Sequence, residues 1–490
     1  MSLKNITIAL FALFFLAACS NSEEKREMNE YLSAYLNDND EVVAFGKAHI
    51  NTILEKADYT SVGMLNMIIG SELEKYSTFV DAKGPIHYAA HGPLNKDGAP
   101  EKVVLFLRVT DQDGLRKHLQ SEMSFDLNES NGFEYASDGD MALGFKQHLA
   151  VVVLEQNNDD EAKILNDIFT RTAGDVSEGK VAELLEADEG DIQMAVSLTN
   201  LYRTASGDIK NLPKSKQKDL EAMLTDGYVK TSLKFEDGRA IMETKNMFGK
   251  DLRAKMFMAG NSSAPILKEL GSGTPRMGIS VNMDVKMMED FANELSPDAL
   301  NKGLGNQYAL LKMATGSKEL KDLWDGKMGL VMFGDPDEFG TFTPEFNAFL
   351  GISKKGRDRL AAMEEMGVDA SSMIPFLPPI DIQDNGVSLM SSPSEGGALK
   401  LPEGAEKFGK SGIDFFMNLE GLDPDDSAEM LDMDELSIMF KVSKFISLEV
   451  DNEGSRLIIT AKDGKENVLK QALEAKMKEI SGDMGNNFAF

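Results

Sequence analysis

Residues 277–295 read MGISVNMDVKMMEDFANEL, and this stretch shows how the chain is built. Its first part, Met277–Met283, is short and rich in apolar side chains, which is typical of a β-strand. Asp284 follows, and an Asp suits the N-cap of a helix because its carboxylate accepts a hydrogen bond from a first-turn N–H. The residues KMMEDFANEL then read as a helix. The stretch predicts a strand that leads directly into a helix.

The same order of strand, Asn or Asp, and helix recurs at three other places. They are Glu41–Phe45 followed by Asn51, Ile192–Leu198 followed by Asn200, and Ile413–Leu419 followed by Asp423. In each case the Asn or Asp is a suitable N-cap for the helix that follows.

Turns that contain glycine join pairs of strand-like runs. Tyr228–Phe235 and Arg239–Asn246 flank Gly238, and Phe445–Val450 and Ser455–Ala461 flank Gly454. Gly supplies the positive φ that tight hairpin turns require. Asp384-Asn385-Gly386 and Asp138-Gly139 predict two further turns.

Together these signals predict a β-α-β-β unit that occurs about four times. The units lie near 41–92, 192–247, 276–391 and 412–461, and the third carries an insertion. We therefore expect an α+β fold of largely antiparallel sheets with helices packed on one face.

The acidic segment that ends in Asp188-Glu189-Gly190 marks a boundary between domains. It predicts an N-terminal α+β domain over 39–190 and a C-terminal α+β domain over 191–490, and both have plausible domain sizes.

The N-terminus carries the only cysteine of the chain. Residues 10–27 read LFALFFLAACSNSEEKRE, and Cys19 is the single cysteine among 490 residues. The apolar run Ile6–Leu16 is too short to span a bilayer, which takes about 20 residues, but it fits a secretory signal. Small residues come before Cys19, as a signal peptidase requires. The plainer alternative is an ordinary secretory signal with a chance cysteine.

Leu16-Ala17-Ala18-Cys19 resembles the lipobox of bacterial lipoproteins. The resemblance implies a signal peptide over residues 1–18, cleavage before Cys19, and acyl chains on the Cys19 thiol and often on the new amino group. Two or more acyl chains hold a protein stably on a membrane. Residues 19–38 are then the lipidated cysteine and a flexible tether.

The residues after Cys19 bear on location. Ser20 is not Asp, the residue that resembles an inner-membrane retention signal, so the expected location is the outer membrane. Ser22-Glu23-Glu24 resembles the surface-export signals of Bacteroidota lipoproteins, and a plain polar tether is the alternative. We therefore leave open whether the anchored protein faces the periplasm or the cell surface.

Composition excludes several classes of partner. The chain has 81 Asp and Glu against 51 Lys and Arg, a net charge of −30, which argues against nucleic acid because phosphate binding needs clustered cations. A hydrophobic content of 42% is typical of a folded protein. With Cys19 acylated, no disulfide, thiol nucleophile or thiolate metal site remains. The expected partners are the membrane, through the acyl anchor, and an envelope protein.

A large, acidic, single-cysteine lipoprotein of strand, helix and hairpin units resembles the uncharacterised Bacteroidota cell-envelope lipoproteins, which are classed as a domain of unknown function. That resemblance implies no catalytic residues and no cofactor.

The pair His87 and His91 has the spacing of a zinc site on a helix, where residues four apart share a face. Gly84-Pro85 and Gly92-Pro93 bound this stretch and predict a strand instead. Residues four apart in a strand lie roughly 13 Å from one another. We expect no metal site here.

Three short motifs match those of penicillin-recognising enzymes in the right order. They are Ser215-Lys-Gln-Lys218, Ser280-Val-Asn282 and Lys410-Ser-Gly412. Such an enzyme needs a buried serine whose lysine has lost water. Ser215 lies instead among charged residues, which predicts an exposed position and no catalysis.

Two acidic stretches are candidate calcium sites. Asp335–Gly340 begins like an EF-hand loop but has Phe where ligands should stand, and Asp423–Asp426 reads as the start of a helix. We predict no metal ligand at either.

The sequence thus predicts a membrane-anchored envelope lipoprotein that serves as a binding or interaction module, with Cys19 as its lipidation site. The ligand is not identified. An envelope hydrolase whose site is not recognisable from the sequence is the alternative.

Overall fold

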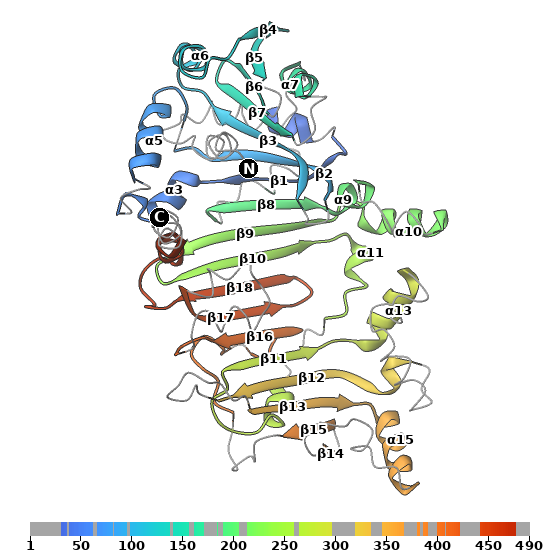
Figure 1. Ribbon diagram of the computed structural model, residues 1–490. Coiled ribbons are helices and arrows are strands. Elements are labelled where there is room, and N and C mark those ends of the chain that lie inside the picture. Colours follow the sequence, from blue (N-terminus) through green and yellow to red (C-terminus); the bar gives the residue numbers. More distant parts are fainter. Residues whose placement is uncertain are drawn as a thin grey trace, which may run out of the picture. The chain divides into compact units, whose positions relative to one another are not determined.

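The computed structural model describes most of the chain from residue 31 to residue 476. The described ranges are 31–36, 39–61, 66–81, 83–95, 99–137, 141–155, 161–170, 184, 190–204, 213–258, 264–295, 319–334, 345–366, 380–382, 386–390, 399–406, 408–421 and 442–476. The chain forms two compact units, Met1–Glu236 and Asp237–Phe490. Both contain helices and an antiparallel sheet, which confirms the predicted class of α+β with largely antiparallel strands (Figure 1).

The N-terminal unit contains a sheet in the order β9-β8-β1-β2-β3-β7-β6-β5-β4, with every neighbouring pair antiparallel. Its strands are β1 Val42–Ala48, β2 Ile86–Leu94, β3 Pro100–Arg108, β4 Asn128–Ser130, β5 Phe133–Ser137, β6 Met141–Lys146, β7 Leu149–Glu155, β8 Ile192–Ser197 and β9 Tyr228–Glu236.

The helices of the N-terminal unit connect these strands. They are α3 Ile50–Lys56, η1 Tyr59–Ser61, η2 Asn66–Gly70, α5 Ser71–Tyr76, α6 Gln112–Ser121, α7 Glu161–Thr170, α9 Leu198–Thr204 and α10 Lys214–Leu224. Helix α6 begins at a capped end, where the Asp111 carboxylate accepts a hydrogen bond from the Gly114 N–H at 3.0 Å.

Helices α6 and α7 lie on opposite faces of the sheet at β6. Leu143 and Phe145 belong to the core cluster that contains Leu115 and Leu119 of α6. Gly144 lies between them and so faces the other way, where a Cβ would come within 2.9 Å of the Phe169 ring of α7. The prediction of helices on one face only is therefore wrong at this strand, because both faces of β6 are apolar and each needs a cover.

The strands of the C-terminal unit, which we call the C-terminal sheet, pair in the order β10-β18-β17-β16-β11-β12-β13-β15-β14, again antiparallel throughout. Its strands are β10 Arg239–Met247, β11 Met277–Asn282, β12 Trp324–Phe333, β13 Glu345–Ile352, β14 Ile380–Ile382, β15 Gly386–Met390, β16 Ile413–Asn418, β17 Ser443–Val450 and β18 Gly454–Ala461. Its helices include α11 Lys250–Arg253, α12 Ala264–Lys268, α13 Val285–Leu295, η5 Leu320–Asp322 and α15 Lys354–Glu365, and residues 468–476 form a further helix.

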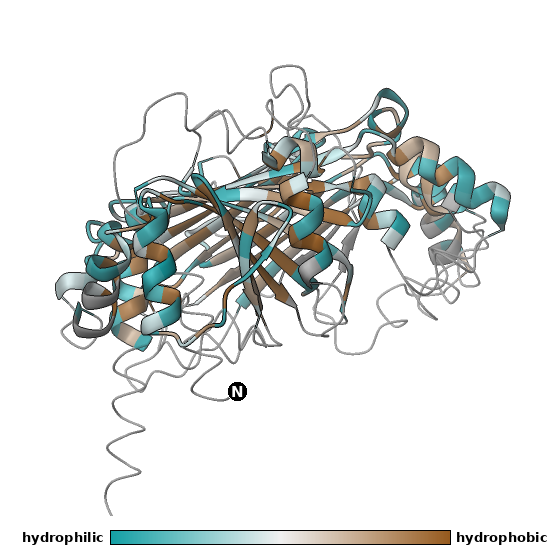
Figure 2. Cartoon of the chain, turned by 90° about the horizontal axis from the view of Figure 1, so that it is seen from above, coloured by the Kyte–Doolittle hydropathy of each residue, from teal (hydrophilic) through white to brown (hydrophobic). Residues whose placement is uncertain are grey.

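The largest cluster of buried side chains in the C-terminal unit lies between the sheet and α12. It contains Ile266, Leu270, Val331, Phe349, Ala405, Phe408, Phe416 and Phe445. Glycines in the strands permit this close packing, since a Cβ on Gly329 would come within 2.5 Å of the Ile266 side chain. Figure 2 shows hydrophobic residues concentrated on the strands and hydrophilic residues on the helices.

The predicted helix start at Asp284 is confirmed, because its carboxylate accepts a hydrogen bond from the Met287 N–H at 2.9 Å at the start of α13. The same prediction is wrong for Asn51 and Asn200. Asn51 lies inside α3 and its side chain donates to Glu55. Asn200 lies inside α9, and its side-chain amide donates to the Val42 carbonyl of β1 at 2.9 Å. Asp423 lies outside the described residues.

The division between the compact units falls after Glu236, whereas the sequence placed a boundary near residue 190. Strand β8 lies beyond that predicted boundary, yet it pairs with β1 in the N-terminal unit. Residues 31–36 belong to the range predicted as a tether, and they form a helix in which Leu32 and Tyr35 are buried.

Candidate interaction surface on the C-terminal sheet

One face of the C-terminal sheet carries only uncharged side chains across seven strands. The pairing registers place them in three cross-strand rows over β13, β12, β11, β16, β17, β18 and β10. The central row is Ala348, Leu330, Ile279, Phe415, Leu448, Leu457 and Met242. The two rows beside it are Leu350, Met328, Val281, Ile413, Val450, Ser455 and Thr244, and Phe346, Met332, Met277, Met417, Ile446, Ile459 and Ala240. We call these three rows the open apolar face.

Most side chains of the open apolar face are half-buried, and Leu350 is 42% exposed. Four of them, Val281, Met417, Ile446 and Ala240, are buried. Three helices of this unit pack away from this face. Helix α12 packs on the opposite face, and α13 and η5 meet β12 at its first residues, around Trp324. None of these three helices lies over the open apolar face.

The opposite face, under α12, carries the apolar core cluster together with several buried polar residues. Ser280, Asn282, Asn347, Asp414 and Ser447 are all buried, and they alternate along their strands with residues of the open apolar face. An antiparallel sheet with one covered face normally presents polar side chains on the other. This sheet departs from that pattern because it is apolar on both faces, which is typical of a sheet that is covered on both sides.

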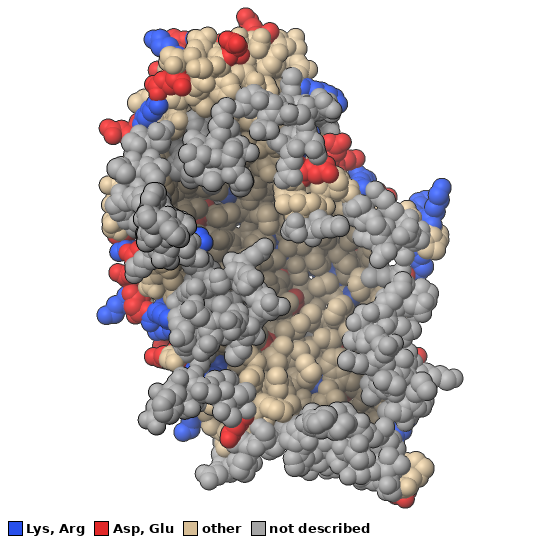
Figure 3. Space-filling view, in the orientation of Figure 1, with Lys and Arg blue, Asp and Glu red and all other residues tan. Residues whose placement is uncertain are grey.

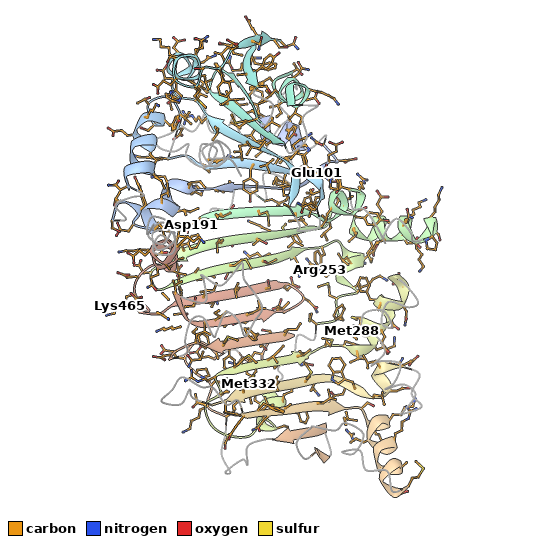
Figure 4. All side chains as sticks on the ribbon, in the orientation of Figure 1. Glu101, Asp191, Arg253, Met288, Met332 and Lys465 are labelled. Carbon is orange, nitrogen blue, oxygen red and sulfur yellow. The ribbon has the colours of Figure 1, made fainter. Side chains whose placement is uncertain are left out.

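Figure 3 shows uncharged residues over the strands of this unit and charged residues mainly toward its margins. From a strand spacing near 4.8 Å and a rise near 3.4 Å per residue, seven strands by three rows cover about 600 Å². That area matches the largest apolar patches on ordinary monomers, about 300–600 Å², which are often functional. Met332, labelled in Figure 4, belongs to the row along one margin.

The buried acid Asp414 anchors the polar side of this sheet. Its Oδ2 accepts hydrogen bonds from the Ser411 N–H at 3.0 Å and from the Ser280 hydroxyl at 3.4 Å. Burial raises the pKa of Asp414, and the nearby Glu449 carboxylate on β17 acts in the same direction. The arrangement holds the loop before β16 in place.

His87 and His91 lie in β2, as predicted, and both are buried. His87 stands opposite Lys47 of β1, and His91 makes a 2.5 Å hydrogen bond with the Tyr35 hydroxyl. Burial, followed by the charge of Lys47, lowers the pKa of His87 to about 3. A cation beside the imidazole disfavours a metal ion there. Among the described residues, no group of three or more His, Cys, Asp or Glu is placed to hold a metal ion.

The surroundings of the penicillin-recognising motifs do not suit a catalytic site. Ser215 and Lys218 are exposed on α10 in the N-terminal unit. In the C-terminal unit, Ser280 is buried on β11 and bonds to Asp414, whereas Lys410 is exposed in the loop before β16. The predicted exposure of Ser215 is confirmed.

Cys19 and both calcium candidates, Asp335–Gly340 and Asp423–Asp426, lie outside the described residues. Within those ranges, no helix has the length and apolar character to cross a membrane.

Comparisons with known proteins find little. No protein-family model matches the chain, and no curated protein does. Crystal form I of TP0453 matches 43% of this chain and 76% of its own, with 9% identity and a TM-score of 0.25. Crystal forms III and IV of TP0453 match 44% of this chain and 80% and 79% of their own, with 8% and 6% identity and TM-scores of 0.27. Similarity at this level carries no conclusion about function.

Proposed function

We propose that this protein is a lipid-anchored envelope lipoprotein that works as an interaction module and binds the apolar surface of an envelope protein through the open apolar face. The observation that carries this proposal is that both faces of the C-terminal sheet are apolar. One face packs under α12 through Val331, Phe349 and Phe416, and the open apolar face carries three further rows of uncharged, mainly apolar side chains.

The first support comes from the energetics of the open apolar face. Burial of apolar surface is worth about 25 cal/mol per Å². Burying even half of about 600 Å² would therefore contribute several kcal/mol to association, before the entropic costs of binding. A partner that covers this surface would remove it from water.

The second support is the lipobox at Leu16–Cys19. An acyl anchor at Cys19 would hold the protein at the outer membrane, where a net charge of −30 keeps it soluble and limits unspecific contacts. Binding at an uncharged face is then selective, because the remaining surface carries the acidic excess.

The repeated strand and helix units of the chain also agree with an interaction module. We infer four β-α-β-β units, beginning at β1, β8, β11 and β16. After β1, β8 and β11 the chain continues with helices and then two strands, and after β16 the described residues continue with the paired strands β17 and β18. The first strands also pair with one another, β1 with β8 and β11 with β16. Repeated strand units build wide sheets, and a wide sheet offers an extended binding surface.

The hydrolase alternative gains no support from the described residues. Its nominal nucleophile Ser215 is exposed, and its second serine, Ser280, is used in a hydrogen bond to Asp414. We therefore keep the interaction module as the proposed function.

The test places a photo-crosslinking amino acid at Leu330 or Phe415 in the full chain and irradiates intact cells. Met366, which is 72% exposed and lies outside the open apolar face, is the control position. We expect one adduct of defined mass from both test positions, its loss when Ile279→Asp is added, and none from Met366. Equal labelling at all three positions, or none at Leu330 and Phe415, would refute the proposal.

A further inference from the structure

We propose that the partner of the open apolar face is a second copy of this chain, so that two C-terminal sheets pack face to face around a twofold axis. This inference rests on the proposed function, since it names the protein that covers the same face.

Charge leaves the open apolar face as a place where two copies can meet. Each chain carries a net charge of −30, so two copies repel one another over most of their surfaces. The open apolar face is the exception, because none of its three rows contains a charged residue. Two copies can therefore meet there without placing like charges together.

The area is sufficient for a dimer. A face of about 600 Å² on each copy gives about 1,200 Å² in total, which reaches the lower end of stable protein interfaces. Two sheets that pack face to face lie about 10 Å apart with interdigitating side chains, and such packing needs apolar residues over several strands on both sides. The open apolar face provides them over seven strands.

The side chains also suit a surface that must match itself. Met277, Met328 and Met332 are unbranched and adjust to irregular gaps. Phe415 stands at the middle of the central row, on the fourth of the seven strands. In a twofold interface the same patch lies on both sides, so residues near the axis meet their own copies. Phe415 and its neighbours Ile279 and Leu448 are the expected axis residues.

Anchoring would strengthen the association. Two chains held on one membrane are confined to a layer, and their effective concentration rises without any new contact. A modest apolar interface then suffices to pair them.

The experiment uses full-length chains with one added cysteine, because Cys19 is the only native one. Ile279→Cys, Phe415→Cys and Leu448→Cys are each expressed as two differently tagged copies in the same cells. A short bis-maleimide is applied, and cross-linked species are isolated through one tag and probed for the other. Met366→Cys is the control, since Met366 is exposed directly after the end of α15. Resistance to limited proteolysis checks that each variant is folded.

We expect a cross-linked species that contains both tags from at least one central position, and its loss when Leu330→Asp is added in the same chain. Met366→Cys should give no such species, and Met366→Asp should not remove it from the central positions. A cross-link from the central positions to a different polypeptide would overturn the second copy but leave the proposed function standing. No intermolecular cross-link from any of the three folded variants would overturn both.

Discussion

Phe415 and Phe416 are adjacent in β16 and offer a direct test of whether the two faces of the C-terminal sheet differ as described. The perturbation is the same in both cases, Phe to Ala. Phe416 is 1% exposed and packs edge-on against Phe408, with ring centroids 4.9 Å apart, and parallel to Phe445 at 6.1 Å. Phe415 is half-buried on the open apolar face.

The expected costs follow from this difference in burial. Replacing a fully buried Phe by Ala costs about 3–5 kcal/mol of unfolding free energy, because transfer energy is lost and a cavity remains. The Phe408 and Phe445 rings cannot fill that space without leaving their own packing positions. Full burial of a Phe side chain is worth about 1.5–3 kcal/mol, so a half-buried Phe415 should cost about 1–2 kcal/mol. The two variants should differ by roughly 2–3 kcal/mol, more than tenfold in the unfolding equilibrium constant.

The assay is guanidinium unfolding followed by tryptophan fluorescence. Trp324 is the only tryptophan of the chain and lies in β12, where it packs against Val285 and Leu320, so it reports on the C-terminal unit alone. Dilute protein is used, and each curve is repeated at a tenfold higher concentration to detect association.

An equal loss of about 3–5 kcal/mol for both variants at low protein concentration would refute the reasoning. It would mean that Phe415 is as deeply buried within one chain as Phe416, and that the open apolar face is an ordinary core surface. A Phe415→Ala cost that grows with protein concentration would instead agree with a second copy on that face.

Three further predictions address the anchor, the buried acid and the excluded hydrolase. Cys19→Ala should release the protein from membranes when cells are fractionated, whereas the matched Ser20→Ala should not; a Cys19→Ala chain that still extracts only with detergent would contradict the anchor. Burial raises the pKa of Asp414, so its protonated form is favoured in the fold, and its contribution to stability, complete below the unfolded pKa near 3.8, is lost as pH rises through the folded pKa. Asp414→Asn should therefore flatten the fall of melting temperature above about pH 4, and an unchanged profile would rule this out. Ser215 should not be acylated by a fluorescent β-lactam, and an adduct at Ser215 in mass spectra would reopen the hydrolase reading.

Local signals in the sequence predicted the elements well. The strand and capped helix at Met277–Leu295 are present because each signal acts within a few residues: side-chain alternation sets the strand, and the Asp284 carboxylate binds a first-turn N–H. The paired strands β17 and β18 are present for the same reason, with Gly454 supplying the turn. The separation of His87 and His91 along β2 also followed from local glycine and proline signals.

Pairings between distant segments could not be predicted in this way. Strand β1 lies beside β8, and β11 beside β16, although more than a hundred residues separate each pair in the chain. The composition of a strand does not identify the strand that pairs with it. The boundary between the compact units and the order of the strands are therefore known only from the structure. The role of Asn200 could not be predicted for the same reason, since its side chain donates a hydrogen bond to the Val42 carbonyl of β1 and does not cap its own helix.

The open apolar face was missed because it is a property of rows that cross the strands. Ile279, Leu330 and Phe415 are each unremarkable within their own strands and become one surface only through the pairing registers. One signal was available in the sequence. Strand β16 reads IDFFMN, and its apolar residues fall on both faces of the strand, which is typical of a strand that is covered on two sides.

That double covering also explains where the polar groups lie. Asp414 and Ser280 point toward α12, and the fold satisfies them with hydrogen bonds to each other and to the Ser411 N–H. A polar side chain can be buried on the covered face when it forms hydrogen bonds within its own chain. The neighbouring Phe415 and Ile279 are stabilised by the removal of water alone, which any well-matched apolar surface can provide. The covered face therefore fixes the fold of one chain, and the open apolar face remains available to a second. Phe415→Asp should therefore leave the chain folded and abolish its association with a second copy.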